Sequence, residues 1–192
     1  MKNIFLKISV IIVLLAFGCR ERTPQEIKDD NTACMQCADL PLSKRMKLYP
    51  FNAATKIQMI SWGERVDTTY GEFDSYQYSF AKKNDTVCYS KCKEIITLNK
   101  KQIDQLSFLM YNIGMKDTKA GLSVNSCYNP RNAIIFLDKK GKILEYIELC
   151  FECQQVRFSK NANLGLRCAQ KLDLLKALFR KVGIKHGILN EK

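Results

Sequence analysis

The sequence predicts an α+β domain with a small antiparallel sheet, a central β-hairpin and two packed helices. Two apolar, β-branched runs, 133–137 and 143–149, lie on either side of a turn sequence. Two other segments, 100–112 and 168–182, carry apolar residues at helical spacing. The resulting order of strand, strand, helix, hairpin and helix is typical of an α+β domain. A chain of 192 residues is long enough for one such domain with appendages.

The predicted hairpin is closed by the turn sequence 138–141, Asp-Lys-Lys-Gly. Asp suits the first position of a type I turn and Gly the left-handed position, which fits a three-residue loop with a glycine bulge. The pairs that this loop places opposite each other are Ile135 with Glu145, Ala133 with Ile147 and Cys127 with Cys153. One face is predicted to carry Ala133, Ile135, Leu137, Ile143, Ile147 and Leu149, and the other Ile134, Phe136, Leu144 and Tyr146. Because both faces are apolar, we expect the hairpin to be central in its sheet or covered on both sides.

Cysteines stand at the open end of this hairpin. Opposed residues of antiparallel strands have Cα atoms about 4.5–5.5 Å apart, a span that a disulfide bridges. The register therefore predicts a Cys127–Cys153 bridge. A two-residue loop would instead put Glu152 opposite Cys127, and Pro130 interrupts the ladder. Cys127–Cys150 is the alternative pairing.

The elements before the hairpin follow in order. Residues 55–62 alternate as a first strand, with Ile57 and Met59 on one face and Ile60 and Trp62 on the other. The segment 67–79 is rich in aromatic residues, which indicates a strand and loop over the core, or alternatively a ligand surface. A short strand is expected at 94–98.

The two helices have recognisable ends. Asn99 is a suitable N-cap for the helix at 100–112, and Gly114 a suitable stop. After a short strand at 154–158, the last helix is predicted at 168–182, with Gly183 as its C-terminal cap. Its buried stripe is expected to comprise Leu172, Leu175, Leu178, Phe179 and Val182.

The hairpin also carries a family resemblance. The pattern Cys-Tyr-x-Pro-Arg at 127–131, an apolar strand, a turn and Ile-Glu-Leu-Cys-Phe-Glu-Cys at 147–153 resembles a family of small bacterial envelope lipoproteins of the Bacteroidetes type. The resemblance covers 127–159 and implies an envelope location but no activity. Members often have a histidine after the Pro-Arg pair, where this chain has Asn132. Any acid–base or metal role of that histidine is therefore absent here.

The N-terminus predicts export and lipid attachment. Residues 1–18 combine an early positive charge, an apolar run and a final Gly18 before Cys19, as in a lipoprotein signal peptide. Cys19 is the predicted lipid-attachment site, and acyl chains there would anchor the chain to the membrane. We expect 19–33 to be a polar tether and 34–192 a single cysteine-rich domain. The predicted location is the cell envelope, with the outer membrane favoured over the inner.

The chain is strongly basic, with a formal charge of +12. Its lysines and arginines are scattered and accompany no nucleic-acid-binding motif, which argues against a nucleic-acid partner. A solvated basic surface explains the pattern, and attraction to anionic lipid near the anchor is the alternative. We expect an envelope partner of unspecified identity.

Nine cysteines are many for a chain of this length. Apart from Cys19, they are Cys34, Cys37, Cys88, Cys92, Cys127, Cys150, Cys153 and Cys168. An even number in an exported protein favours disulfides and no cofactor. Besides Cys127–Cys153, we expect bridges from Cys34 and Cys37 to Cys88 and Cys92.

Two other uses of these cysteines remain open. Cys34, Cys37, Cys88 and Cys92 have spacings that could form a zinc site. The Cys150-x-x-Cys153 motif could be a thiol–disulfide oxidoreductase site, although it follows a strand rather than opening a helix. His186 is the only histidine and lies after the last helix, so a Ser/His or Cys/His catalytic pair is not expected.

The acidic residues of the hairpin are the last group of candidate functional residues. Glu145, Glu148 and Glu152 could act in acid–base chemistry, but we expect them to face solvent or to meet Arg131 or Arg157. The sequence therefore predicts a lipid-anchored binding or structural module that is not an enzyme. Its alternatives are a zinc-binding module and an envelope oxidoreductase.

Overall fold

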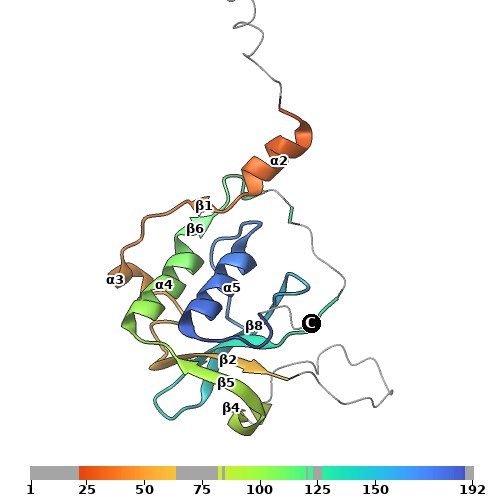
Figure 1. Cartoon of the computed structure of the whole chain (residues 1–192). Coiled ribbons are helices and arrows are strands. Elements are labelled where there is room, and N and C mark those ends of the chain that lie inside the picture. Colours follow the sequence, from red (N-terminus) through yellow and green to blue (C-terminus); the bar gives the residue numbers. More distant parts are fainter. Residues whose placement is uncertain (1–21, 64–81, 84, 120, 123–126, 189–192) are drawn as a thin grey trace, which may run out of the picture.

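The computed structural model describes residues 22–63, 82–83, 85–119, 121–122 and 127–188 (Figure 1). They form an α+β fold, as predicted. The elements are α2 (Pro24–Thr32), β1 (Met35–Gln36), α3 (Leu42–Arg45), β2 (Lys56–Trp62), β3 (Lys82–Lys83), β4 (Thr86–Val87), η1 (Tyr89–Lys91), β5 (Cys92–Thr97), α4 (Lys100–Tyr111), β6 (Ile113–Gly114), β7 (Asn132–Leu137), β8 (Ile143–Cys150), β9 (Gln155–Phe158) and α5 (Lys171–Val182).

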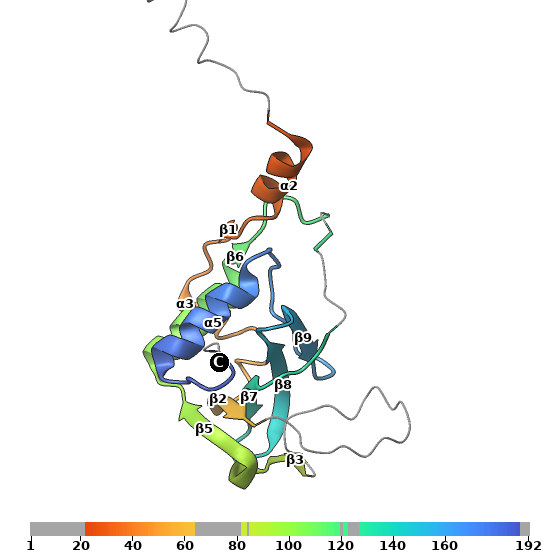
Figure 2. The ribbon, with the colours of Figure 1, turned by 45° about the vertical axis from the view of Figure 1, so that its right-hand side comes forward.

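The main sheet has the strand order β5-β2-β7-β8-β9, and every neighbouring pair is antiparallel. The predicted hairpin is the β7–β8 pair, which lies inside the sheet between β2 and β9. Helices α4 and α5 lie side by side on one face of the sheet (Figures 1 and 2). The expected central position of the hairpin is confirmed.

Both faces of the sheet are apolar because each covers its own core. The larger core packs α4 and α5 against the sheet residues Ile57, Met59, Ile134, Phe136, Ile147 and Leu149. The smaller core, on the opposite face, comprises Ile60, Trp62, Val87, Ala133, Ile135 and Leu137. Full burial of one such side chain stabilises the fold by roughly 1.5–3 kcal/mol. The two faces predicted for β2 are confirmed.

The hairpin register agrees with the prediction only next to the turn. Asp138 N donates to Lys142 O, Gly141 has a φ of 76°, and Leu137 pairs with Ile143. A bulge then shifts the pairing by one residue, so that Phe136 opposes Glu145.

The predicted pairs Ile135–Glu145 and Ala133–Ile147 are therefore wrong. Because the bulge adds one residue to the second strand, Ile147 moves to the helix-covered core with Ile134, whereas Ile143 stays against the smaller core. Leu149 shares the new face of Ile147. Ile147 and Leu149 therefore lie on the face opposite to that of Ile143, whereas the prediction placed all three on one face.

The helix ends show how local sequence fixes the elements. Asn99 caps α4 through a reciprocal pair of hydrogen bonds with Gln102, as its position predicts. Gly114 is not the stop of this helix. Helix α4 ends at Tyr111, and Gly114 belongs to β6, which pairs with β1. Gly183 has the left-handed conformation expected of the α5 cap, with a φ of 110°.

Helix α5 begins at Lys171, three residues later than predicted, and its expected buried stripe is confirmed. The predicted tether, 19–33, includes α2, which Thr23 and Glu26 cap. No helix in the described part of the chain is long and apolar enough to cross a membrane. The signal segment 1–18, Cys19 and the aromatic segment 67–79 lie outside the described residues.

Candidate thiol and disulfide site

The open end of the hairpin carries the predicted Cys127–Cys153 disulfide. The two Cα atoms are 5.6 Å apart. Both cysteines lie outside the paired strands: Cys127 precedes β7, and Cys153 lies in the turn between β8 and β9. Because neither residue belongs to the ladder, the one-residue shift does not separate them. The predicted pairing is present, although the register that suggested it is wrong.

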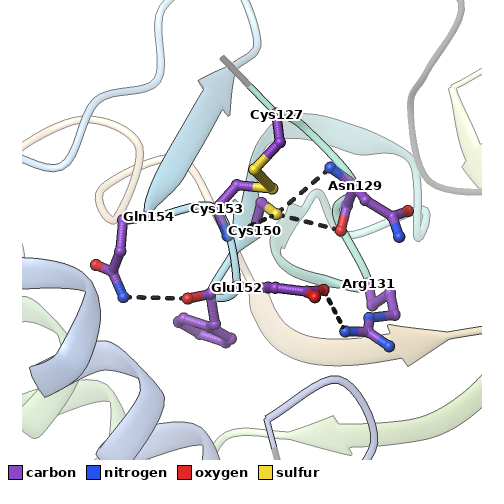
Figure 3. The surroundings of a disulfide bond; sticks show 8 residues. Cys127, Asn129, Arg131, Cys150, Glu152, Cys153 and Gln154 are labelled. Atoms are coloured by element: carbon purple, nitrogen blue, oxygen red, sulfur yellow. Dashed lines mark hydrogen bonds and ion pairs between the residues drawn. A yellow bond between two sulfur atoms is a disulfide. The ribbon is translucent and has the colours of Figure 1, made fainter. Parts of the chain in front are cut away.

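Cys150 is a buried thiol beside this bridge (Figure 3). It is the last residue of β8, and its side chain is covered by the chain around Asn129. The Cys150 thiol donates to Asn129 O at 3.2 Å, and its sulfur accepts from the backbone N–H groups of Asn129 at 3.4 Å and Cys153 at 3.3 Å. The alternative Cys127–Cys150 bridge is not formed.

Charged and aromatic groups surround the cysteines. Arg131 forms an ion pair with Glu152 at 2.9 Å, as expected for that carboxylate (Figure 3). The Tyr128 hydroxyl donates to Glu148 at 3.1 Å, and the Arg157 guanidinium lies 3.9 Å from the centre of the Tyr128 ring. Burial, and then the Glu148 carboxylate, raise the pKa of Tyr128 well above its ordinary value.

The hairpin carboxylates were expected to face solvent or to meet Arg131 or Arg157. This is wrong for Glu145, which is buried away from both arginines, whereas buried Glu148 lies opposite Arg157 in the β8–β9 pairing. Glu145 accepts hydrogen bonds from the Tyr49 hydroxyl at 2.7 Å, the Ser159 hydroxyl and the Asn161 side-chain amide at 3.0 Å. Burial alone would raise the pKa of Glu145. The hydrogen bonds from Ser159, Tyr49 and Asn161 outweigh it and hold the pKa below its ordinary value. The bulge places Glu145 on the same face of β8 as Ile147, which belongs to the helix-covered core.

The second disulfide joins Cys34 to Cys168, which are 134 residues apart in the sequence. The predicted links from Cys34 and Cys37 to Cys88 and Cys92 are therefore wrong, because Cys37, Cys88 and Cys92 are thiols. Pairing of β1 with β6 carries Cys34 toward the start of α5, where its backbone N–H donates to Gln170 at 2.9 Å. Cys88 and Cys92 flank η1. Strand β5, which begins at Cys92, lies at the end of the molecule opposite β1 (Figure 1).

The four cysteines of the zinc alternative are not brought together. Cys34 is oxidised, and Cys37, Cys88 and Cys92 are thiols. Within the described ranges, no three His, Cys, Asp or Glu side chains are grouped as metal ligands. Burial, together with the neighbouring Cys88, raises the pKa of the Cys92 thiol.

Two clusters were not anticipated from the sequence. Lys171 is buried, and its ammonium group donates to the carbonyl groups of Leu109 and Ile113 near the end of α4. Burial lowers the pKa of Lys171 to about 8, while the nearby Cys37 acts to raise it. Lys171 lies four residues before Leu175, on the buried face of α5, so the helical spacing gave a sign of this burial, but a lysine is ordinarily expected to be exposed.

The other cluster lies at the β5 edge of the sheet. Glu94 accepts from the Ser61 hydroxyl at 2.7 Å and from the backbone N–H groups of Lys185 and His186 at 3.0 and 2.9 Å. Burial alone would raise the pKa of Glu94, but these hydrogen bonds lower it. Buried Asn132 donates to the His186 carbonyl at 3.0 Å. These contacts hold the chain after α5 against the sheet.

A groove of about 930 Å³ opens between α2, β9 and the start of α5. Its walls include Lys28 and Asp29 from α2, Val156 and Phe158 from β9, and Cys168 of the second disulfide. Phe158 is one of the exposed large hydrophobic residues, with 42% of its surface accessible. The groove therefore combines charged and apolar walls beside the segment predicted as the tether.

No family model, no curated protein and no solved structure matches the chain.

Proposed function

We propose that this chain is an exported, lipid-anchored module of the cell envelope that binds a partner or has a structural role, and that it is not an enzyme. The Cys34–Cys168 disulfide is the observation that carries the proposal. Disulfides persist in oxidising compartments outside the cytoplasm, which is where the signal segment 1–18 would direct the chain. The hairpin motif that resembles envelope lipoproteins supports the same location.

The position of this disulfide suits an anchored protein. Cys34 comes two residues after the end of α2, where the proposed tether from Cys19 would enter the domain. Its bridge to Cys168 joins that entry point to the chain just before α5. A covalent link there would hold β1 against the core when the anchor restrains the N-terminus. We propose the outer membrane as the site of attachment.

Replacement of the anchor residue tests the location. Cys19→Ser removes the thiol that would be acylated, and we expect the protein to move from the carbonate-washed membrane pellet to the soluble envelope fraction. Cys37→Ser is the matched control, because Cys37 is an exposed thiol whose loss should leave the protein in the pellet. Retention of the Cys19→Ser protein in the pellet would exclude lipid attachment at this residue.

The groove is the binding surface that we propose. A photo-reactive aromatic residue in place of Phe158 is expected to yield a cross-linked product in intact cells, because position 158 lines the groove and is exposed. The same residue in place of Lys139, in the exposed hairpin turn, is the control and should yield none. Equal cross-linking at the two positions, or none at either, contradicts a partner in the groove.

A further inference from the structure

Three cysteines share one small volume at the open end of the hairpin. Cys127 and Cys153 form the disulfide, and the Cys150 sulfur lies 3.3 Å from the backbone nitrogen of Cys153 (Figure 3). A thiol beside a disulfide is the arrangement from which thiol–disulfide exchange proceeds. The three sulfur atoms also differ in their access to solvent. Cys150 and Cys153 are 1% and 3% exposed, whereas Cys127 is on the surface.

We propose that Cys150 is an internal exchange partner of this disulfide, and that the exchange presents Cys127 as a reactive surface thiol for small thiols and disulfides. The Cys150 proton passes to solvent, and the Cys150 thiolate attacks the sulfur of Cys153. The Cys127–Cys153 bond breaks as a Cys150–Cys153 bond forms. The Cys127 thiolate leaves and takes a proton from solvent, so the step involves no net oxidation.

Burial determines which sulfur is attacked. Attack on Cys153 expels the thiolate of Cys127, which water solvates. Attack on Cys127 would expel the thiolate of Cys153 into a buried site, where a charge is costly. The first direction is therefore favoured. The backbone N–H groups of Asn129 and Cys153, which already point at the Cys150 sulfur, would stabilise the attacking thiolate.

Contacts other than the Cys127–Cys153 bridge also connect the two ends of the hairpin. Cys150 ends β8 and Cys153 lies in the turn that follows, so their new bridge closes only a local loop. The Arg131–Glu152 ion pair at 2.9 Å still connects the start of β7 to this turn after Cys127 is released. This inference is independent of the membrane anchor.

The test is a time course of alkylation on the full chain, purified in detergent and kept at mildly alkaline pH without added thiol. Samples treated with iodoacetamide are quenched in acid and mapped by peptide analysis without reduction. We expect adducts to accumulate on Cys127 together with a Cys150–Cys153 bridge, at a rate that does not depend on protein concentration. In Cys150→Ser, which keeps a hydrogen-bonding group, labelling of Cys127 should be at least about tenfold slower.

Cys37→Ser is the matched control, since it removes an exposed thiol remote from the hairpin and should label like the unaltered protein. Equal labelling of Cys127 with and without Cys150 would overturn the proposal. If Cys150→Ser does not fold, the map of the unaltered protein decides. A Cys127 adduct with a Cys150–Cys153 bridge supports the exchange, and an intact Cys127–Cys153 bridge throughout the time course refutes it.

Discussion

Replacement of Cys34 and Cys168 together by serine is expected to lower the free energy of unfolding by about 5 kcal/mol. The bridge closes a loop of 134 residues, and a disulfide stabilises chiefly by restricting the unfolded chain, more so as the loop lengthens. It also holds β1 and the end of α2 to the start of α5. Denaturant unfolding followed by circular dichroism, at matched protein concentration, measures the loss.

The second disulfide provides the comparison. Replacement of Cys127 and Cys153 by serine opens a loop with a separation of only 26 residues, so the same model predicts a smaller loss of about 3.5 kcal/mol. The ordering of the two variants is the sharper prediction. A Cys34→Ser/Cys168→Ser protein that is as stable as the unaltered one would show that this bridge is not formed in the mature protein.

Glu145→Ala is expected to lower the free energy of unfolding by about 3 kcal/mol at neutral pH. The substitution removes a buried carboxylate that accepts hydrogen bonds from Tyr49, Ser159 and Asn161, and it leaves those donors without their acceptor. The control is Glu152→Ala, since the Glu152 side chain is 66% exposed and its ion pair should contribute less than about 1 kcal/mol. If the two substitutions lowered the free energy of unfolding by similar amounts, the larger contribution expected of Glu145 would be contradicted.

The contribution of Glu145 also depends on pH. Its folded-state pKa lies below the ordinary glutamate value of about 4.3, so the folded protein binds the proton less readily than the unfolded chain. The stabilisation is therefore fully present above the ordinary value and is lost as the pH falls through the lower folded-state pKa. The stability difference between Glu145→Gln and the unaltered protein should shrink over that acidic range. A difference that stays constant from neutral pH to pH 3 would contradict this account.

The sequence predicted the elements well because their signals are local. The Asn99 cap, the Gly141 turn and the Gly183 stop each depend on a few adjacent residues, and all three are found where they were expected. The bulge in β8 has no such local signature. It arises within the packed sheet, and it reverses the face of Ile147 and of Glu145 relative to the prediction.

The cysteine pairs show the same division between local and long-range information. Cys127 and Cys153 belong to one hairpin, so the turn between them was enough to suggest their bridge. Cys34 and Cys168 meet only because β1 pairs with β6, and two-residue strands leave almost no pattern in a sequence. Spacing alone suggested the zinc alternative for Cys34, Cys37, Cys88 and Cys92, which the structure does not bring together. The third member of the hairpin site, Cys150, was recognised from the sequence, but its contacts with Asn129 required the structure.

The central claim is that the cysteines form disulfides that cross-link an exported domain. Peptide mapping of the mature protein tests this claim most directly. The protein is alkylated rapidly before any reduction, digested and mapped, with zinc assayed on the same sample. We predict a Cys34–Cys168 bridge, alkylated Cys37, Cys88 and Cys92, and no stoichiometric metal. Recovery of Cys34, Cys37, Cys88 and Cys92 as four free thiols, with about one metal ion per chain, would contradict the account and identify a metal-binding module.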